Sequence, residues 1–291
     1  MKNFILLGAA GYVAPRHMKA IKDVGGNLLA IADPHDSVGV IDQHFSNCNY
    51  FQDFERLDRY CYKLLTEGIK IDYVSICSPN YLHDAHCRWA LRLGADAICE
   101  KPLVLSERNL DALINLQKDT GHTVYGVYQL RYHPNFIAMK NAIKEEDNKV
   151  EINYSTPRGN WYYFSWKGQV GKSGGVETNI GCHLFDVCTA LFGSPQDFRV
   201  IDVGAGHSSG VLFFADAQVQ YDLSVRGDSP NRVFKINDIP FAFDSGFVDL
   251  HTHVYESILS GHSIPIEEYR PSIRICEKIR KAQESWKKIL R

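Results

Sequence analysis

The stretch Phe4-Ile5-Leu6-Leu7-Gly8-Ala9-Ala10-Gly11-Tyr12-Val13-Ala14 decides the fold of the first half of the chain. Its apolar run from Phe4 to Leu7 predicts a buried strand that ends at Gly8, and a helix is expected over residues 11–24. Glycine in a strand-to-helix turn allows a pyrophosphate to approach closely, and the start of the helix directs N–H groups toward that anion. The stretch therefore indicates a dinucleotide-binding unit.

The spacing of this motif is G-x-x-G-x-x-A rather than G-x-G-x-x-G, so it needs a second observation. Asp33 follows the next apolar run, residues 27–32, and stands 25 residues after Gly8. A carboxylate at this place suits both hydroxyls of a ribose and repels a 2′-phosphate, which favours NAD over NADP. A glycine turn and a surface aspartate in a domain that binds no nucleotide are the alternative. The cofactor residues expected from this turn and carboxylate are Gly8, Ala10, Gly11, Tyr12, Val13 and Asp33.

Strands and helices alternate along the first 130 residues. Further strands are expected at 71–77, 96–100 and 123–127, and helices at 53–67, 81–93 and 106–120. This alternation predicts a doubly wound (Rossmann) parallel sheet with right-handed crossovers, which we assign to residues 1–126.

The pattern changes after about residue 148. Strands are expected at 150–155, 198–203, 211–215, 217–226 and 232–237, and helices at about 247–260 and 271–290. Apolar and polar residues alternate along 217–226, which is typical of a half-buried antiparallel strand. Residues 127–291 are therefore expected to form an α+β domain with a mostly antiparallel sheet, whose final helix is free to pack back on the first domain.

Composition excludes several classes of protein. The chain of 291 residues carries 32 basic and 34 acidic residues, so its formal charge of -2 offers no basic surface for nucleic acid. No run of about 18 apolar residues predicts a membrane helix, and the apolar start is too short for a signal peptide. We expect a cytoplasmic protein without a nucleic-acid or membrane partner.

Cysteine and histidine spacing argues against a metal site. None of the eight cysteines forms a Cys-x-x-Cys pair, so buried free thiols in a reducing cytoplasm are expected. His83 with His86, and His251 with His253, lack a carboxylate or cysteine at the spacing of a ligand set. We therefore expect no metal.

The segment Ile98-Cys99-Glu100-Lys101-Pro102 ends a predicted buried strand with a carboxylate and a lysine. The carboxyl edge of a doubly wound sheet is where ligands bind. Beside a cationic nicotinamide, like charge and burial would disfavour the ammonium of Lys101 and bring it toward acid–base work near neutral pH. A surface lysine before a loop is the alternative that the residue types alone favour.

Glu100-Lys101-Pro102, placed after such a unit, resembles the signature of the glucose–fructose oxidoreductase, inositol dehydrogenase and MocA family. The segment 78–83 is similar to the family's nicotinamide-side loop, and the segment 179–186 to its second signature, which carries an active-site histidine. The resemblance implies that Lys101 is catalytic or orients the substrate, that His183 is the active-site histidine, and that the second domain has an open-faced sheet.

Within this family, the UDP-N-acetyl-glucosaminuronate 3-dehydrogenases are similar over several longer segments. The matching residues are 8–17, 36–39, 73–83, 129–131, 158–162, 165–168 and 172–173. These enzymes imply an NAD-dependent homotetramer that makes O-antigen sugar precursors from a UDP-sugar, with a 2-oxo acid as a possible reoxidant of NADH. Two departures are the pair Gly174-Gly175, where a bulkier residue is expected, and a short region at 190–245.

The resemblance also implies the remaining site residues. Further cofactor contacts are assigned to Asp36, Ser78, Pro79, Asn80, His83, Glu100, Lys101 and Gln129. Substrate contacts are assigned to Lys101, Arg131, Arg158, Asn160, Tyr162, Lys167, Lys172, Ser173, Asn179 and His183.

Residue types in the second domain agree with an anionic sugar nucleotide. Arginine offers a planar fork for oxyanions, and the aromatic residues at 161–163 and 166 offer faces for a sugar or uracil ring. A solvated, tyrosine-rich loop is the alternative. On a helix, Asn179, His183 and Asp186 would share one face, so that Asp186 could orient the imidazole; a structural histidine capping the helix is the alternative.

These observations lead to one functional prediction and two alternatives. We expect NAD-dependent oxidation of the 3-hydroxyl of UDP-N-acetyl-D-glucosaminuronate, with Lys101 or His183 as the base and the other stabilising the developing alkoxide. Another sugar or cyclitol dehydrogenase of the family, or a catalytically silent NAD-binding regulator, would be the alternatives.

Overall fold

The computed structural model describes residues 1–243 and 249–289, which form two compact units. Unit 1 consists of Met1–Leu103, Arg108–Gln129 and Val248–Glu267, and unit 2 of Val104–Glu107, Leu130–Phe247 and Glu268–Arg291. The segment 250–259, which the sequence analysis placed in the second domain, thus belongs to unit 1. Residue 290 of the expected final helix lies outside the described residues.

Unit 1 contains a parallel sheet of six strands in the order β3-β2-β1-β4-β5-β6, as its described residues show. The strands are β1 (Asn3–Leu7), β2 (Asn27–Ala32), β3 (Asn49–Phe51), β4 (Tyr73–Ile76), β5 (Asp96–Glu100) and β6 (Val124–Val127). The direction of strand progression reverses between β1 and β4, and ligands of such sheets bind at the carboxyl ends of the strands there. The predicted doubly wound sheet is confirmed.

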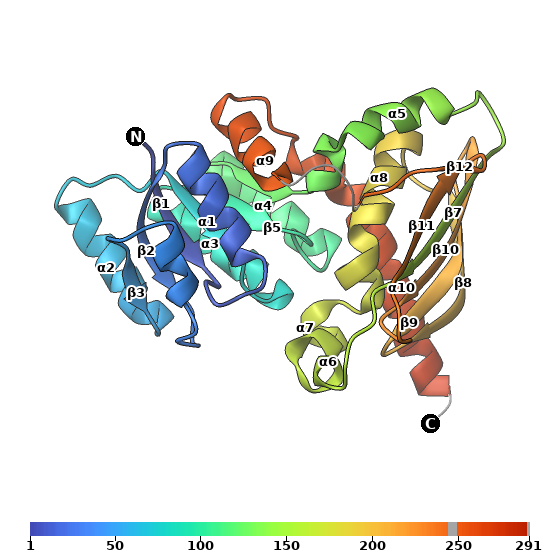
Figure 1. Cartoon of the computed structure of the whole chain (residues 1–291), viewed down its shortest axis with the longest axis horizontal. Helices are drawn as coiled ribbons and strands as arrows, with labels where there is room; N and C mark the ends of the chain where they lie inside the picture. Colours follow the sequence, from blue (N-terminus) through green and yellow to red (C-terminus); the bar gives the residue numbers. More distant parts are fainter. Residues whose placement is uncertain (244–248, 290–291) are drawn as a thin grey trace. The chain divides into compact units, whose positions relative to one another are not determined.

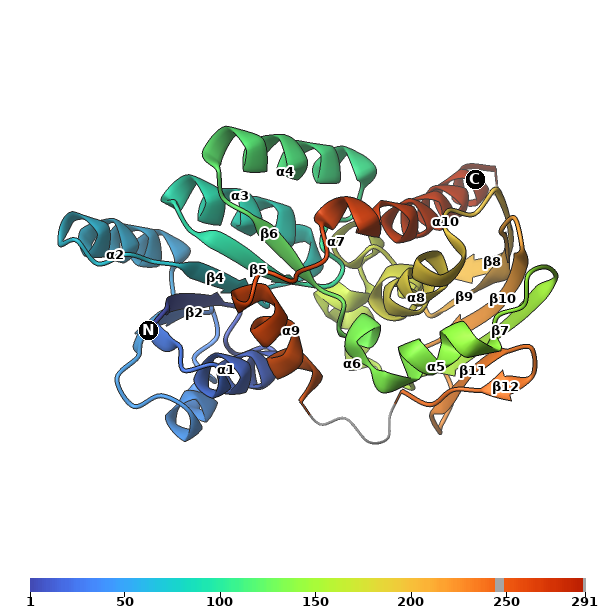
Figure 2. The same ribbon diagram turned by 90° about the horizontal axis from the view of Figure 1, so that it is seen from above.

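Helices cover both faces of this sheet. They are α1 (Ala14–Asp23), α2 (Phe54–Thr66), α3 (His83–Leu93), α4 (Glu107–Thr120) and α9 (Leu250–Leu259), with 3-10 turns at Gly39–Gln43 and Asn80–Leu82. A further 3-10 turn, Gln129–Tyr132, begins at the last residue of the Arg108–Gln129 segment of unit 1 and continues into unit 2. Figure 2 shows α2, α3 and α4 on one face and α1 with α9 on the other. Right-handed crossovers that run in opposite directions along the sheet require this division. Helix α9 joins α1 through Thr252, which donates a hydrogen bond of 2.7 Å to Asp23.

Unit 2 contains a mixed sheet in the order β12-β11-β7-β10-β9-β8. Its strands are β7 (Asn148–Ser155), β8 (Asp197–Gly204), β9 (His207–Phe213), β10 (Ala217–Ser224), β11 (Asn231–Ile236) and β12 (Ile239–Pro240). Only β7 and β10 pair in parallel among these described strands, so the expected mostly antiparallel sheet is confirmed. Along β10, Val219 and Tyr221 are buried while Gln218 and Gln220 are exposed.

The helices of unit 2 lie against one face of this sheet or beyond its edge (Figure 1). They are α5 (Pro134–Ala142), α6 (Trp161–Phe164), α7 (Val170–Ser173), α8 (Cys182–Phe192) and α10 (Arg270–Ile289), with a π-helical turn at Glu177–Gly181 and a 3-10 turn at Trp166–Gly168. The 3-10 turn Ile266–Tyr269 begins in unit 1 and ends in unit 2. Apolar residues of α8 and α10, such as Phe185 and Ile279, share one core with the buried face of β10.

Two expectations about the whole chain can be compared with its described part. All eight cysteines are free, and seven are buried, with Cys48 partly exposed. No helix in the described ranges is long and apolar enough to cross a lipid bilayer.

Candidate functional site

Gly8 brings the ends of three strands of unit 1 together. Its φ of +84° lies in the left-handed region, and a Cβ there would stand 2.5 Å from the backbone nitrogen of Ser78. The Gly8 N–H donates a 2.8 Å hydrogen bond to the carbonyl of Ala32. A side chain at this position would therefore push the end of β1 away from the backbone that follows β4.

Asp33 is fixed at the end of β2 through both carboxylate oxygens. Oδ2 accepts a hydrogen bond of 3.0 Å from the N–H of Ala10, and Oδ1 accepts one of 2.9 Å from the N–H of His35. The N–H of Ala10 thus points to this carboxylate. Each ionised oxygen keeps a further lone pair for a ligand hydroxyl. A glycine turn, a helix start and an oriented carboxylate form a donor set that fits a dinucleotide.

The other residues of the expected cofactor turn differ in exposure. Tyr12 is 88% exposed, and the guanidinium of Arg16 lies 5.7 Å from the centroid of its ring. Asp36 is exposed and Gln129 is partly buried.

His83 lies inside unit 1 rather than at an open ligand surface. It is 1% exposed, and its ring nitrogens lie 2.7 Å from the carbonyl oxygens of Pro102 and Ser78. Burial lowers the pKa of this imidazole, although the two carbonyls oppose the shift. His83, which the resemblance assigned to the cofactor, therefore ties the loop after β4 to the Glu100–Pro102 turn. The Ser78 hydroxyl in that loop bonds to His86 Nδ1 at 2.9 Å.

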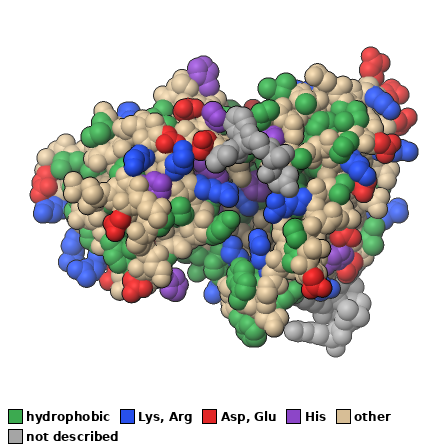
Figure 3. Space-filling model, viewed as in Figure 1, with side chains coloured by type: hydrophobic (Ala, Val, Ile, Leu, Met, Phe, Trp, Pro, Cys, Tyr) green, Lys and Arg blue, Asp and Glu red, His purple; other side chains and the backbone are tan. Residues whose placement is uncertain are grey.

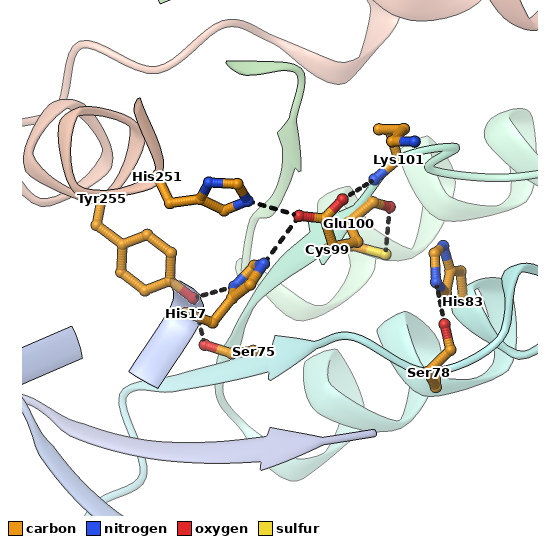
Figure 4. Close-up of polar contacts among 9 residues, drawn as sticks. All are labelled: His17, Ser75, Ser78, His83, Cys99, Glu100, Lys101, His251 and Tyr255. Carbon is orange, nitrogen blue, oxygen red and sulfur yellow. Dashed lines mark hydrogen bonds and ion pairs between the residues drawn. The ribbon is translucent and has the colours of Figure 1, made fainter. Parts of the chain in front are cut away.

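Glu100 is the centre of a buried polar network (Figure 4). Its Oε1 atom lies 2.9 Å from His17 Nε2 and 3.0 Å from His251 Nε2, and its Oε2 atom accepts a 3.2 Å hydrogen bond from the N–H of Lys101. The Tyr255 hydroxyl lies 2.8 Å from His17 Nδ1 and 2.7 Å from the Ser75 hydroxyl. Three elements, α1, β5 and α9, thus meet at one carboxylate.

No sequence signal revealed this network, because the two histidines stand 83 and 151 residues from Glu100. The ligand atoms of His17, Glu100 and His251 lie within 4.8 Å of one another, a grouping that could hold a metal. The expectation of no metal rested on spacing along the chain, and spacing cannot reveal a grouping of residues that are distant in the sequence. The absence of a metal stays a prediction.

In unit 2, the Arg131 guanidinium forms ion pairs with two carboxylates. Its Nε and Nη2 atoms donate hydrogen bonds of 2.8 and 2.7 Å to the two oxygens of Asp186, and Nη1 donates one of 2.9 Å to Glu268. Its side chain is only 7% exposed. The structure therefore places Arg131, expected at the substrate, and Asp186, expected to orient His183, in a bidentate pair with each other.

Asn179 connects the second signature to the aromatic segment. Its side-chain amide donates hydrogen bonds of 3.1 Å to the Tyr162 hydroxyl and 3.2 Å to the carbonyl of Lys167. Burial raises the pKa of Tyr162, which is 2% exposed. Asn179 lies in the π-helical turn, whereas His183 is partly buried on α8. The α-helical spacing that would place Asn179 and His183 on one face does not extend across the π-helical turn.

The segment 158–172 presents cationic and aromatic side chains on the surface of unit 2. Arg158, Asn160 and Lys172 are exposed, and Phe164 is 86% exposed. The Lys167 ammonium lies 4.9 Å from the centroid of the Trp166 ring. Figure 3 shows hydrophobic side chains gathered over α6 and α7. Such a surface can bind an oxyanion and stack on a ring.

The Gly174-Gly175 pair makes room for buried polar side chains. Both glycines have a positive φ, of +86° and +90°, and a Cβ at Gly175 would collide with the Glu177 carboxylate. This explains why no bulkier residue stands there. Ser173 is buried beside them, and its hydroxyl accepts a 3.1 Å hydrogen bond from the N–H of Gly175.

Sequence reasoning did not single out Glu177. Its side chain is fully buried, and neither carboxylate oxygen accepts a hydrogen bond from another described residue. Burial raises the pKa of this carboxyl to about 7. The fold thus holds a titratable group in the same turn as Asn179.

Family comparisons match both halves of the chain. Residues 2–128 match the family described as "Oxidoreductase family, NAD-binding Rossmann fold", and residues 146–203 match "Oxidoreductase family, C-terminal alpha/beta domain". Glucose-6-phosphate 3-dehydrogenase of Bacillus subtilis is 25% identical over 80% of this chain and 66% of its own length. Inositol 2-dehydrogenase of Rhizobium meliloti is 26% identical over 66% of this chain and 55% of its own. Both alignments span less than two thirds of the relative.

Solved structures resemble the chain over nearly its full length. The WlbA (WbpB) dehydrogenase of Thermus thermophilus, solved with NAD and α-ketoglutarate, is 40% identical, with a TM-score of 0.92 over 96% of this chain and 95% of that chain. The same dehydrogenase solved with NAD and UDP-GlcNAcA is 39% identical over the same shares. WlbA of Bordetella pertussis, at 17% identity and a TM-score of 0.77 over 96% and 94%, shares the fold. The chain therefore belongs to the glucose–fructose oxidoreductase, inositol dehydrogenase and MocA family of oxidoreductases, and its first unit is an NAD-binding Rossmann domain.

Proposed function

We propose that this protein is an NAD-dependent sugar dehydrogenase that oxidises the 3-hydroxyl of UDP-N-acetyl-D-glucosaminuronate to a ketone. One observation carries the proposal: 39% identity over nearly the whole of both chains to a dehydrogenase solved with NAD and UDP-GlcNAcA. The product would serve nucleotide-sugar synthesis for a surface glycan such as an O-antigen.

NAD, when bound, supplies the acceptor for the hydride that leaves C3 of the sugar. The turn at Gly8 and the Asp33 carboxylate would hold its pyrophosphate and a ribose, together with Gly11, Tyr12, Val13 and the loop at 78–80. Lys101 or His183 takes the proton of the 3-hydroxyl, and the other donates a hydrogen bond to the developing alkoxide. Glu100 holds the backbone of Lys101.

The substrate side of the proposal rests on unit 2. Arg158 and Lys172 are exposed cations that would bind the pyrophosphate and the uronic carboxylate, while Asn160 and Lys167 would border the sugar. Tyr162, which is buried, would support this surface from below through its bond to Asn179. Arg131 is a weaker candidate, because a bound anion would compete with the bidentate Asp186. We assign Arg131, Ser173 and Asn179 to shaping this surface.

Three further properties are proposed for the working enzyme. A 2-oxo acid reoxidises NADH, and 2-oxoglutarate is the first compound to test, since the Thermus enzyme was solved with it. The exposed face of the unit 2 sheet would be buried in a homotetramer, which light scattering of the purified protein tests. Eight free cysteines support a reducing compartment such as the cytoplasm.

The testing experiment offers the purified protein a panel of substrates with NAD and follows absorbance of the reduced nicotinamide. The panel contains UDP-N-acetyl-glucosaminuronate, glucose 6-phosphate and myo-inositol. Reduction of NAD by the uronate alone supports the proposal. Faster reduction by one of the other two would replace it with another sugar or cyclitol dehydrogenase, for which the similarity to a glucose-6-phosphate 3-dehydrogenase is the observation in favour. Tight NAD binding without turnover of any compound would favour a regulator.

A further inference from the structure

The network around Glu100 closes as a chain of hydrogen bonds with one donor and one acceptor at each contact. Oε1 of the ionised Glu100 accepts from Nε2–H of both His17 and His251. The Nδ1 atom of His17 then has a lone pair, which accepts from the Tyr255 hydroxyl, and the Tyr255 oxygen accepts from the Ser75 hydroxyl. With His17 neutral, each of these contacts pairs one donor with one acceptor around the Glu100 carboxylate.

Burial and hydrogen bonding oppose each other in this network. Burial disfavours the charge on Glu100, but the hydrogen bonds from His17 and His251 outweigh it and hold the pKa of the carboxyl well below its usual range. Burial lowers the pKa of His17, in spite of the attraction of Glu100. Both shifts agree with a neutral His17 and an ionised Glu100 carboxylate.

The second carboxylate oxygen of Glu100 connects the network to the backbone of the next residue, Lys101. Oε2 accepts from the N–H of Lys101, so the plane of the carboxylate sets where that N–H points. The same turn is held on its far side by His83, at 2.7 Å from the Pro102 carbonyl, and by the Tyr128 hydroxyl, 3.4 Å from the N–H of Leu103. The backbone that carries Lys101 is thus fixed by side chains from several parts of unit 1.

We propose that His17 and His251 are positioning residues for Lys101, which they hold in place through the Glu100 carboxylate. This inference rests on the proposed function, because it takes Lys101 as a group that touches the substrate. It assigns a role to α9, which follows the second sheet in the chain and returns to the Rossmann unit to deliver His251. A displacement of about 1 Å in a catalytic group costs on the order of 100-fold in rate, so a small relaxation of the turn would be measurable.

The test compares variants that remove or keep the N–H donor to Glu100. His17→Leu and His251→Leu remove it, whereas His17→Gln and His251→Gln place a side-chain amide near the position of Nε2. His253→Leu is the matched control, since His253 lies on the same helix and bonds to Glu256. The leucine variants should lower kcat about 10- to 100-fold with little change in KM for NAD, and the glutamine variants should recover most of the rate. If the histidines had a purely structural role, kcat of the glutamine variants would not recover relative to the leucine variants.

A second measurement needs neither substrate nor turnover. Hydrogen exchange at the Lys101 amide should accelerate at least about tenfold in the leucine variants and stay near the unmodified rate in the glutamine and His253→Leu proteins. Only the leucine variants lose a donor that fixes the Glu100 carboxylate, and this carboxylate accepts the hydrogen bond of the Lys101 amide. If a leucine variant fails to fold, the glutamine variants can still be compared with the unmodified protein in both measurements.

The outcomes separate this inference from the proposed function. If Lys101→Met abolishes turnover while folded His17→Leu and His251→Leu proteins keep kcat within twofold, the inference is wrong and the proposed function stands. If no UDP-sugar is turned over but Lys101 exchange follows the histidine variants, the proposed function fails and the positioning network stands. Binding of one zinc ion at submicromolar affinity, lost in both leucine variants, would overturn the inference, because the three side chains would then be metal ligands.

Discussion

Arg131 donates two parallel hydrogen bonds of 2.8 and 2.7 Å to the Asp186 carboxylate, and both side chains are almost fully buried. Truncating one partner of such a pair leaves an uncompensated charge inside the protein. Arg131→Met should therefore lower the free energy of unfolding by about 3–5 kcal/mol, measured by urea denaturation. Arg199→Met, at an exposed position of the same unit, should change it by less than about 0.5 kcal/mol. Equal unfolding midpoints for these two variants would contradict this account of the pair.

Asp33 should decide the preference for NAD. We expect the unmodified protein to bind NAD more tightly than NADP, because a 2′-phosphate would face a fixed carboxylate. Asp33→Ser should narrow the ratio of the two dissociation constants by about tenfold or more, a loss of about 1.4 kcal/mol of discrimination, measured by titration calorimetry. Asp42→Ser, at an exposed position, should leave the ratio unchanged. Equal affinities for both cofactors in the unmodified protein would refute the prediction.

Glu177 should make stability depend on pH. Its pKa is about 7 in the folded protein, against about 4.3 for an exposed glutamate, so the folded state holds this proton more tightly than the unfolded state. The contribution of this proton to the free energy of unfolding is therefore fully present below about pH 4.3 and is lost as the pH rises through 7. Glu177→Gln cannot ionise, and it should exceed the unmodified protein in unfolding free energy by about 3 kcal/mol at pH 8.5 and by little at pH 4.5. The control is Glu145→Gln, at an exposed position. A gain that is the same at both pH values would show that Glu177 is not the titrating group.

Much of the fold could be predicted because the signals are local. The strand 27–32 and the strand 96–100 were expected with the bounds they have, since each is an apolar run between turn residues. The strand Asn49–Phe51 and the helix Pro134–Ala142 were not expected, because one has three residues and the other no clear apolar stripe. Both owe their structure to contacts that a local pattern does not contain.

The candidate site was less predictable for the same physical reason. Local motifs identified the turn at Gly8, Asp33 and Lys101, whereas the network of His17, Glu100 and His251 exists only after folding joins distant segments. Arg131 shows a different difficulty for prediction from sequence. Its chemistry suits an oxyanion, and the oxyanion it meets is the chain's own Asp186. The roles assigned to Lys101 and His183 stay predictions.

Lys101 and His183 should affect turnover far more than cofactor affinity. Lys101→Met and His183→Asn should each lower kcat by about 100- to 10,000-fold, which is the usual contribution of a positioned acid–base group, while the dissociation constant of NAD changes little. Lys118→Met, at an exposed position of α4, should keep the unmodified rate. Near-normal kcat in both active-site variants with the true substrate would contradict the catalytic assignment.

The most direct test of the central claim compares two UDP-sugars that differ only at C6. A site cation matched to the uronic carboxylate is left unpaired by the neutral hydroxymethyl group, so UDP-N-acetylglucosamine should be a poor substrate. We predict that kcat/KM for UDP-N-acetyl-glucosaminuronate exceeds that for UDP-N-acetylglucosamine by at least about 100-fold, measured by NAD reduction or by single-turnover reduction of tightly held cofactor. Lys172→Met, or Arg158→Met if that cation meets the carboxylate, should lower the ratio. Comparable kcat/KM for both sugars in the unmodified enzyme would contradict the uronate assignment.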